Sequence, residues 1–155
     1  MTYHIIWKNA DGSLKITSMH AAATLEEATE HKDKLILNGE TALFQVIATS
    51  NQLPQDRYFR NAWRFEGGNL TLDIGGCRQR HLDKLRRIRN AKLQDSDPDY
   101  MRALEQGDTV KLDALKTYRQ ALRDMPQNTT ADLQAASAPD AIRNVRPTIL
   151  TAPKP

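Results

Sequence analysis

The chain has 155 residues, a formal net charge of +3, 39% hydrophobic residues and 26% charged residues. No apolar run approaches the roughly 20 residues that cross a bilayer, and the N-terminus lacks the pattern of a signal or transit peptide, so we expect no membrane segment. The single cysteine, Cys77, excludes an internal disulfide and a cysteine-based zinc site.

The first 49 residues predict a small ββαβ unit. Residues 2–8 and 13–18 are rich in β-branched and aromatic residues, and the sequence NADG between them favours the turn of a hairpin. Residues 19–40 predict a helix whose buried stripe holds four residues: Leu25, Ala28, Leu35 and Ile36. Residues 41–49 are apolar enough to predict a central strand.

Turn and cap residues set the limits of these elements. Thr24 and Glu27 have the spacing of a capping box at the start of the helix, and Gly39 is suited to its end. Further on, residues 57–76 predict a second hairpin that turns at Gly67 and Gly68.

Trp63 lies on the first arm of that second hairpin. It has two interpretations: an anchor that packs on the sheet or on the following helix, or a surface aromatic side chain that binds a partner. Gly75 and Gly76 predict a hinge into the helical part of the chain.

Residues 78–126 predict two helices folded against each other. Leu82, Leu85 and Ile88 recur at helical spacing in the first helix. The second helix carries a longer apolar stripe: Leu112, Leu115, Tyr118, Leu122 and Met125. We expect the two stripes to pack together, so that alanine at Leu115 or Leu122 destabilises the fold.

Caps divide this helical region. Asp97 and Pro98 predict the N-cap and first turn of the second helix. Gly107 costs about 1 kcal/mol inside a helix relative to alanine. Because Asp108 is a good N-cap, we expect a break or kink at this point.

Positive charge is concentrated on the first of these helices. Residues 1–75 carry seven basic and nine acidic side chains, whereas residues 78–92 carry seven basic and one acidic side chain. Arg80, Lys84 and Arg87 are predicted to form one exposed row. These cations could pair with the acidic residues of the facing helix, with an acidic partner protein or with nucleic acid. No aromatic side chains for base stacking accompany the arginines, which argues against nucleic acid.

The last segment, 127–155, contains four prolines and few large apolar side chains. It predicts an extended or disordered tail that gains order against a partner or another subunit. Ile149 and Leu150 would be its apolar contacts. Truncation after Pro126 is therefore expected to leave thermal stability nearly unchanged.

The sequence shows no recognised motif of catalysis or of cofactor binding. The four histidines lie on different predicted elements without metal-ligand spacing, and the paired glycines do not form a phosphate loop. The carboxylates show no pairing for general acid and base roles. We therefore predict a protein that is not an enzyme and that uses no metal or cofactor.

The segment IRNAKLQDSDPDYMRALEQGDTVKLDALKTYRQALRDMPQN resembles the C-terminal region of tail assembly proteins of tailed bacteriophages, the tail fibre assembly chaperone group and related prophage proteins. The resemblance rests on an arginine segment, an aspartate-rich turn and the sequence YRQALRDMP. Its positions here are Arg86, Arg89, Asn90, Leu93, Asp95, Asp97, Tyr118, Arg119, Leu122, Arg123, Asp124, Met125 and Pro126. The family often has aspartate at the position of Asn90.

This resemblance implies a non-enzymatic protein that holds or joins tail, tail-fibre or neck components in the host cytoplasm. Retention in the virion tail, self-association, and a basic nucleic-acid-binding accessory protein are the alternatives. The YRQALRD segment either closes the helical hairpin or contacts the partner, and Asp124 is expected to bridge to Arg86 or Arg89. The predicted partner-binding residues are Trp63, Arg80, Lys84, Arg87, Arg119, Arg123, Ile149 and Leu150.

The fold class that follows is α+β. Residues 1–75 are expected to form a small α+β domain that ends in a β-hairpin, and residues 76–126 an amphipathic helical hairpin. Residues 127–155 are expected to form the extended tail.

Overall fold

The computed structural model describes residues 2–8, 14–37, 44–49, 51, 53, 57–66 and 69–155. They fall into two compact units, 1–73 and 74–155. Antiparallel strands dominate the first unit and helices form the second, so the α+β prediction is confirmed. The boundary lies two residues before the predicted one, because Gly75 and Gly76 belong to the first turn of a helix rather than to a hinge.

The first unit contains a three-stranded antiparallel sheet in the order β2-β1-β3. Its strands are β1 (Tyr3–Lys8), β2 (Leu14–Ser18) and β3 (Phe44–Thr49). The predicted ββαβ order is therefore confirmed, but the third strand is not central. β1 is central instead, paired with β2 on one side and β3 on the other, and its side chains of Ile5, Ile6 and Trp7 are buried.

Helix α1 (Leu25–Leu37) begins with the predicted capping box. The backbone N–H of Thr24 donates to Glu27 Oε2 at 2.7 Å, and the N–H of Glu27 donates to Thr24 Oγ1 at 3.1 Å. Ala28 is buried as expected, but Leu25 is 54% exposed, so its predicted place in the stripe is wrong. Gly39 and the side chains of Leu35 and Ile36 lie outside the described residues.

The predicted second hairpin is formed by β4 (Trp63–Glu66) and β5 (Asn69–Leu72). Its turn at residues 67–68 lies outside the described part of the chain. Trp63 is only 3% exposed. It is therefore part of the core, and the interpretation of Trp63 as a surface side chain that binds a partner is wrong.

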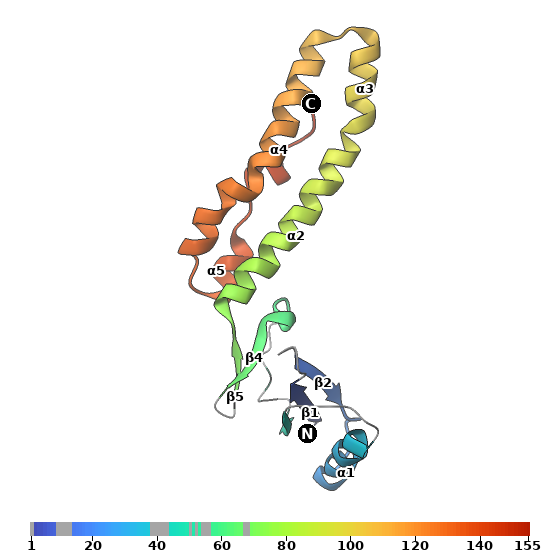
Figure 1. The fold of residues 1–155 in the computed structure, drawn as a ribbon, viewed down its shortest axis with the longest axis vertical. Coiled ribbons are helices and arrows are strands. Elements are labelled where there is room, and N and C mark those ends of the chain that lie inside the picture. The colour runs from blue at the N-terminus through green and yellow to red at the C-terminus, as the bar shows by residue number, and fades with distance from the viewer. Residues whose placement is uncertain are drawn as a thin grey trace. The chain divides into compact units, whose positions relative to one another are not determined.

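The second unit is built on three helices: α2 (Ile74–Asp95), α3 (Asp97–Gln106) and α4 (Thr109–Ala135). Figure 1 shows α2 and α4 running side by side, with α3 at the far end of the hairpin. The predicted break is confirmed: Gly107 has a φ of 65° at the end of α3, and Asp108 accepts a hydrogen bond from the N–H of Lys111 at 3.0 Å. The N-cap of α3 is Ser96 rather than Asp97.

The seam between α2 and α4 contains most of the predicted apolar residues. Leu115, Tyr118, Leu122 and Met125 of α4 are buried, and so is Leu85 of α2. Ile88 is 47% exposed, so its predicted place in the seam is wrong. The buried stripe of α2 instead runs through Cys77, His81 and Leu85 at four-residue steps.

The chain after Pro126 is not a disordered tail. Pro126 lies inside α4, which continues to Ala135, and α5 (Pro139–Asn144) and the 3-10 turn η3 (Thr148–Leu150) follow. Figure 1 shows this segment returning along α2 and α4. We call residues 136–155 the strap. Leu133 in the last turns of α4 and Ile142 in the strap are buried, so both segments belong to the core of the second unit.

None of the helices in the described part of the chain combines the length and the apolar character that a membrane span requires.

Candidate functional site

The junction between α2 and α3 is organised by one arginine of α4. Arg119 Nη1 donates to the Leu93 carbonyl oxygen at 3.2 Å, to Ser96 Oγ at 2.6 Å and to Asp97 Oδ1 at 2.6 Å. Ser96 is fully buried, and its hydroxyl donates to the Leu93 carbonyl oxygen at 2.6 Å. Arg119 therefore satisfies polar groups where one helix ends and the next begins, which positions α3 against α4.

Tyr100 of α3 adds a second contact to this junction. The guanidinium carbon of Arg119 lies 5.4 Å from the centroid of the Tyr100 ring, which is cation–π geometry. Only 17% of the Arg119 side chain is exposed. Arg119 uses its Nη1 atom within the fold, which gives it a structural role, and its partner-binding role stays a prediction.

Replacing Arg119 with alanine is expected to lower the free energy of unfolding by about 1–3 kcal/mol, because Ser96 and Asp97 lose a charged donor. R119K should recover part of the loss, since one ammonium group cannot reproduce the planar fork. Urea unfolding followed by circular dichroism measures this. R123A, an exposed arginine one turn further on, is the matched control and should unfold like the parent chain.

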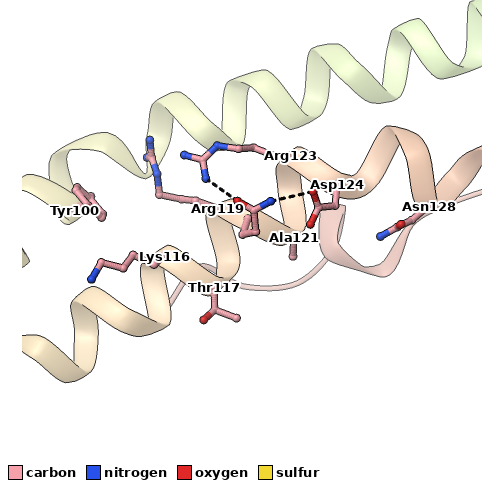
Figure 2. Close-up of a pocket in the computed structure, with 9 residues that line it drawn as sticks. Tyr100, Lys116, Thr117, Arg119, Ala121, Arg123, Asp124 and Asn128 are labelled. Carbon is pink, nitrogen blue, oxygen red and sulfur yellow. Dashed lines mark hydrogen bonds between the residues drawn. The ribbon is translucent and has the colours of Figure 1, made fainter.

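The outer face of α4 borders a shallow hollow of about 910 Å³. Figure 2 shows the residues that line it: Tyr100, Lys116, Thr117, Arg119, Gln120, Ala121, Arg123, Asp124 and Asn128. Its polar groups are largely matched with one another. Lys116 Nζ lies 3.1 Å from Asp113 Oδ1, and Gln120 accepts from Arg123 at 3.3 Å and donates to Asp124 at 2.9 Å.

This hollow therefore presents no convergent set of unsatisfied groups to a small ligand. The predicted bridge from Asp124 to Arg86 or Arg89 is wrong, because Asp124 accepts from Gln120 and Arg86 pairs with Asp83 at 3.0 Å.

The strap is bound mainly through its backbone carbonyls, which accept hydrogen bonds from side chains of α2. Arg78 donates to the Ala136 oxygen from Nη2 at 2.9 Å and from Nε at 3.2 Å. His81 Nε2 lies 2.8 Å from the Val145 oxygen, and Lys92 Nζ donates to the Ala152 oxygen at 3.3 Å. Three side chains at intervals along α2 thus fix the course of the strap.

The C-terminal end of the strap is fixed by Lys154, whose Nζ lies 2.6 Å from Asp99 Oδ2 and 3.0 Å from Asp95 Oδ2. The hydrogen bond from Lys154 lowers the pKa of Asp99, and the hydrogen bonds to Asp99 and Asp95 raise the pKa of Lys154. Both shifts stabilise the charged forms, so the ion pair is maintained through the neutral range.

The pH dependence of this contact follows from the two shifts. Asp99 contributes to the stability of the fold above its unfolded pKa of about 3.9, and this contribution is lost as the pH falls through its lowered pKa in the folded state. Lys154 contributes below its unfolded pKa of about 10.4, and this contribution is lost as the pH rises through its raised pKa in the folded state. The protection of the backbone amides of residues 148–155 against hydrogen exchange, corrected for the intrinsic rate at each pH, should therefore be lost in strong acid and constant between about pH 5 and pH 9. K154M should lower this protection over that whole pH range. Equal protection in K154M and in the parent chain would contradict the role of Lys154 in fixing the strap.

The seven cations of α2 divide into two groups. Arg78 and Lys92 donate to the strap, Arg86 pairs with Asp83, and Arg89 is partly buried. Arg80 and Arg87 are exposed, and neither makes a hydrogen bond or ion pair with another described residue. Lys84 lies between them on the same side of the helix and is partly buried.

Ile149 and Leu150 are half-buried in η3, which packs on α4 and α2 of the same chain, and their role in partner binding stays a prediction. A second hollow of about 350 Å³ lies where η3 meets α4, between Met125, Asp132 and Arg146 among others. Arg123 is exposed on α4, and its role in partner binding stays a prediction.

The burial of His81 and the contact of Arg78 with the strap were not predicted from the sequence. A signal was present for His81, because Cys77, His81 and Leu85 share one helical face. For Arg78 there was none, since a backbone carbonyl acceptor has no sequence signature.

Among the described residues, no cluster of histidine, cysteine, aspartate and glutamate has the geometry of a metal site. The second unit presents instead a helical hairpin, a polar face on α4 whose groups pair with one another, and two exposed arginines on α2, Arg80 and Arg87. Surfaces of this kind are suited to contact with another macromolecule.

Comparison with known proteins agrees with this geometry. The family model described as phage tail assembly chaperone protein matches residues 82–141, from the middle of α2 to α5. No curated protein and no solved structure matches the chain. A chaperone-type assembly family is not an enzyme family. The match covers 60 of the 155 residues and confirms the predicted resemblance to phage tail assembly proteins over residues 82–141.

Proposed function

We propose that this chain is a tail assembly chaperone that binds a phage tail, tail-fibre or neck protein through its helical unit and leaves before the virion is complete. The observation that carries the proposal is the coincidence between the family match, 82–141, and the α2–α4 hairpin. The matched segment includes most of α2, all of α3 and α4 and the start of α5, which supports the helical unit as the part that binds a partner.

The packing of the second unit supports this function. Its core is closed by its own strap, and Ile142, Leu133 and Leu122 are all buried without a partner chain. A unit that is complete by itself can bind a client and release it, whereas a subunit built permanently into a tail usually buries a larger apolar surface in the assembly. The proposed site of action is the host cytoplasm during assembly.

Co-expression tests the proposal directly. Each tail protein of the phage that encodes this chain is co-expressed with the tagged full chain, and the complexes are purified and weighed. We expect a tail, tail-fibre or neck protein to co-purify and to be more soluble than when it is expressed alone. Recovery of the chain without any of these proteins would contradict the proposal.

Mass spectrometry of purified virions separates the chaperone from a structural component. A chaperone is present during assembly and absent from the mature particle. Detection of this chain at the copy number of a tail protein would replace the chaperone assignment by that of a virion component.

A further inference from the structure

We propose that the end of the helical hairpin, residues 101–110, binds an apolar segment of the tail protein that also carries lysine or arginine. This surface, which we call the tip, contains the end of α3, the turn at Gly107 and the start of α4. Figure 1 shows α3 at the far end of the hairpin. The role of the tip rests on the function proposed above and adds to it a surface and the chemistry of the partner.

Large apolar side chains are exposed at the tip. Met101 is 52% exposed, Leu104 is 51% exposed and Val110, in the first turn of α4, is 82% exposed. At about 100° per residue, Met101, Leu104 and Glu105 fall within an arc of about 100° on α3, away from the buried Ala103. A single exposed apolar residue is common on a protein surface, whereas three within ten residues at one end of a unit indicate a contact site.

The backbone that carries these side chains is fixed by hydrogen bonds. Gly107 has a φ of 65° at the end of α3, and the N–H of Asp108 donates to the Ala103 oxygen at 3.0 Å. The side chain of Asp108 caps α4, and Arg119 binds the beginning of α3. A partner therefore meets a preformed surface, which lowers the entropic cost of binding.

The charge of α3 indicates the chemistry of the partner. Asp97 pairs with Arg119 at 2.6 Å. Asp99 pairs with Lys154 at 2.6 Å. Glu105, the third acidic residue of α3, is exposed and makes no hydrogen bond or ion pair with another described residue. A carboxylate beside apolar side chains attracts lysine or arginine, whose aliphatic stems also cover apolar surface, and it repels phosphate. The tip therefore favours a protein segment over nucleic acid.

The size of the tip favours a contact that can be released. A stable protein–protein interface uses about 20–30 residues from each side, whereas the tip has ten. A second copy of this chain bound through the tip alone would not form a stable dimer, but a chaperone has to release its client. Met101 can adapt to the shape of an apolar partner because its side chain is unbranched and flexible.

The experiment uses the full chain and the tail protein that co-purifies with it. Dissociation constants are measured by isothermal titration calorimetry for the parent chain, for L104S/V110S and for L25S. Leu25 supplies the matched control because it is 54% exposed on α1, close to the 51% of Leu104. We expect L104S/V110S to bind at least about tenfold more weakly, because two apolar anchors are lost, and L25S to keep the parent affinity.

Two further variants separate the charge of the tip from its apolar contacts and from folding. E105Q should bind about two- to fivefold more weakly and with a smaller dependence on salt, because a charge pair across the interface is lost. V110S changes a side chain that is 82% exposed, so it should weaken binding with the melting temperature unchanged. V110S keeps the test decisive if L104S/V110S unfolds at a lower temperature than the parent chain.

Three outcomes would overturn the role of the tip. Parent-like affinity of L104S/V110S, or an equal loss in L25S, would remove the tip from the interface. Tighter binding by E105Q would show that the partner presents acidic side chains. A dimer of the parent chain in analytical ultracentrifugation, lost in L104S/V110S, would make the tip a contact between copies. If the parent chain binds no tail protein at all, the proposed function fails and the role of the tip falls with it, which is a different result.

Discussion

The L122A variant is expected to lose about 2–5 kcal/mol of its free energy of unfolding, the range measured for leucine-to-alanine changes in packed cores. Leu122 is fully buried in α4, as are its neighbours on the same stripe, Leu115 and Met125. Removal of three carbon atoms leaves a cavity whose surroundings, two helices and the strap, are each fixed by other contacts and cannot easily collapse.

Urea unfolding at constant pH measures this loss. V110A is the control, because Val110 belongs to the same helix but is 82% exposed, and its truncation should change the free energy of unfolding by less than about 0.5 kcal/mol. A comparable loss in L122A and V110A would mean that the α2–α4 seam is not the core of this unit.

Much of the fold could be predicted because local signals and packing agree. The capping box of Thr24 and Glu27, the helix break at Gly107 and Asp108, and the stripe from Leu115 to Met125 each combine a local preference with a buried face. Where only one of the two was present, the prediction was weaker. Leu25 and Ile88 have the spacing of a stripe but are exposed, because spacing alone does not determine which face a neighbour covers.

The strap was mispredicted for a physical reason. Proline lacks an N–H and clashes in a helix interior at a cost of about 3 kcal/mol, so the sequence predicts that the helix ends at Pro126. The apolar stripe nevertheless continues through Met125, Thr129 and Leu133, and this burial stabilises α4 beyond the proline. Two of the four prolines lie at helix starts in the strap, Pro139 in the first turn of α5 and Pro147 before η3. The carbonyls that accept from Arg78, His81 and Lys92 lie just before α5, just after α5 and just after η3.

The candidate surface was predictable in part. The excess of arginine on residues 78–92 identified the helix, and helical spacing identified Arg80, Lys84 and Arg87 as one row. Sequence could not show which cations the fold itself uses. Arg78 and Arg119 differ from Arg80 and Arg87 only in what lies opposite them, and their acceptors are carbonyls and carboxylates up to 58 residues away.

Truncation after Pro126 is expected to unfold the second unit or to lower its melting temperature strongly, the opposite of what the sequence suggested. The truncation removes the buried side chains of Thr129, Leu133 and Ile142 and exposes the faces of α2 and α4 that they cover. Each large aliphatic side chain contributes about 1.5–3 kcal/mol on burial, and a domain of this size has only about 5–15 kcal/mol to lose.

Thermal unfolding followed by circular dichroism compares three chains: the parent, the truncation after Pro126 and a shorter truncation after Thr151. The shorter truncation removes Lys154 and its pairs with Asp95 and Asp99, which are partly exposed, so its effect should be much smaller. I142A supplies a point change within the strap and should cost about 2–5 kcal/mol, since Ile142 is fully buried. Parent-like melting of the Pro126 truncation would show that the strap lies on the unit without being part of its core, and that its surface is available to other chains.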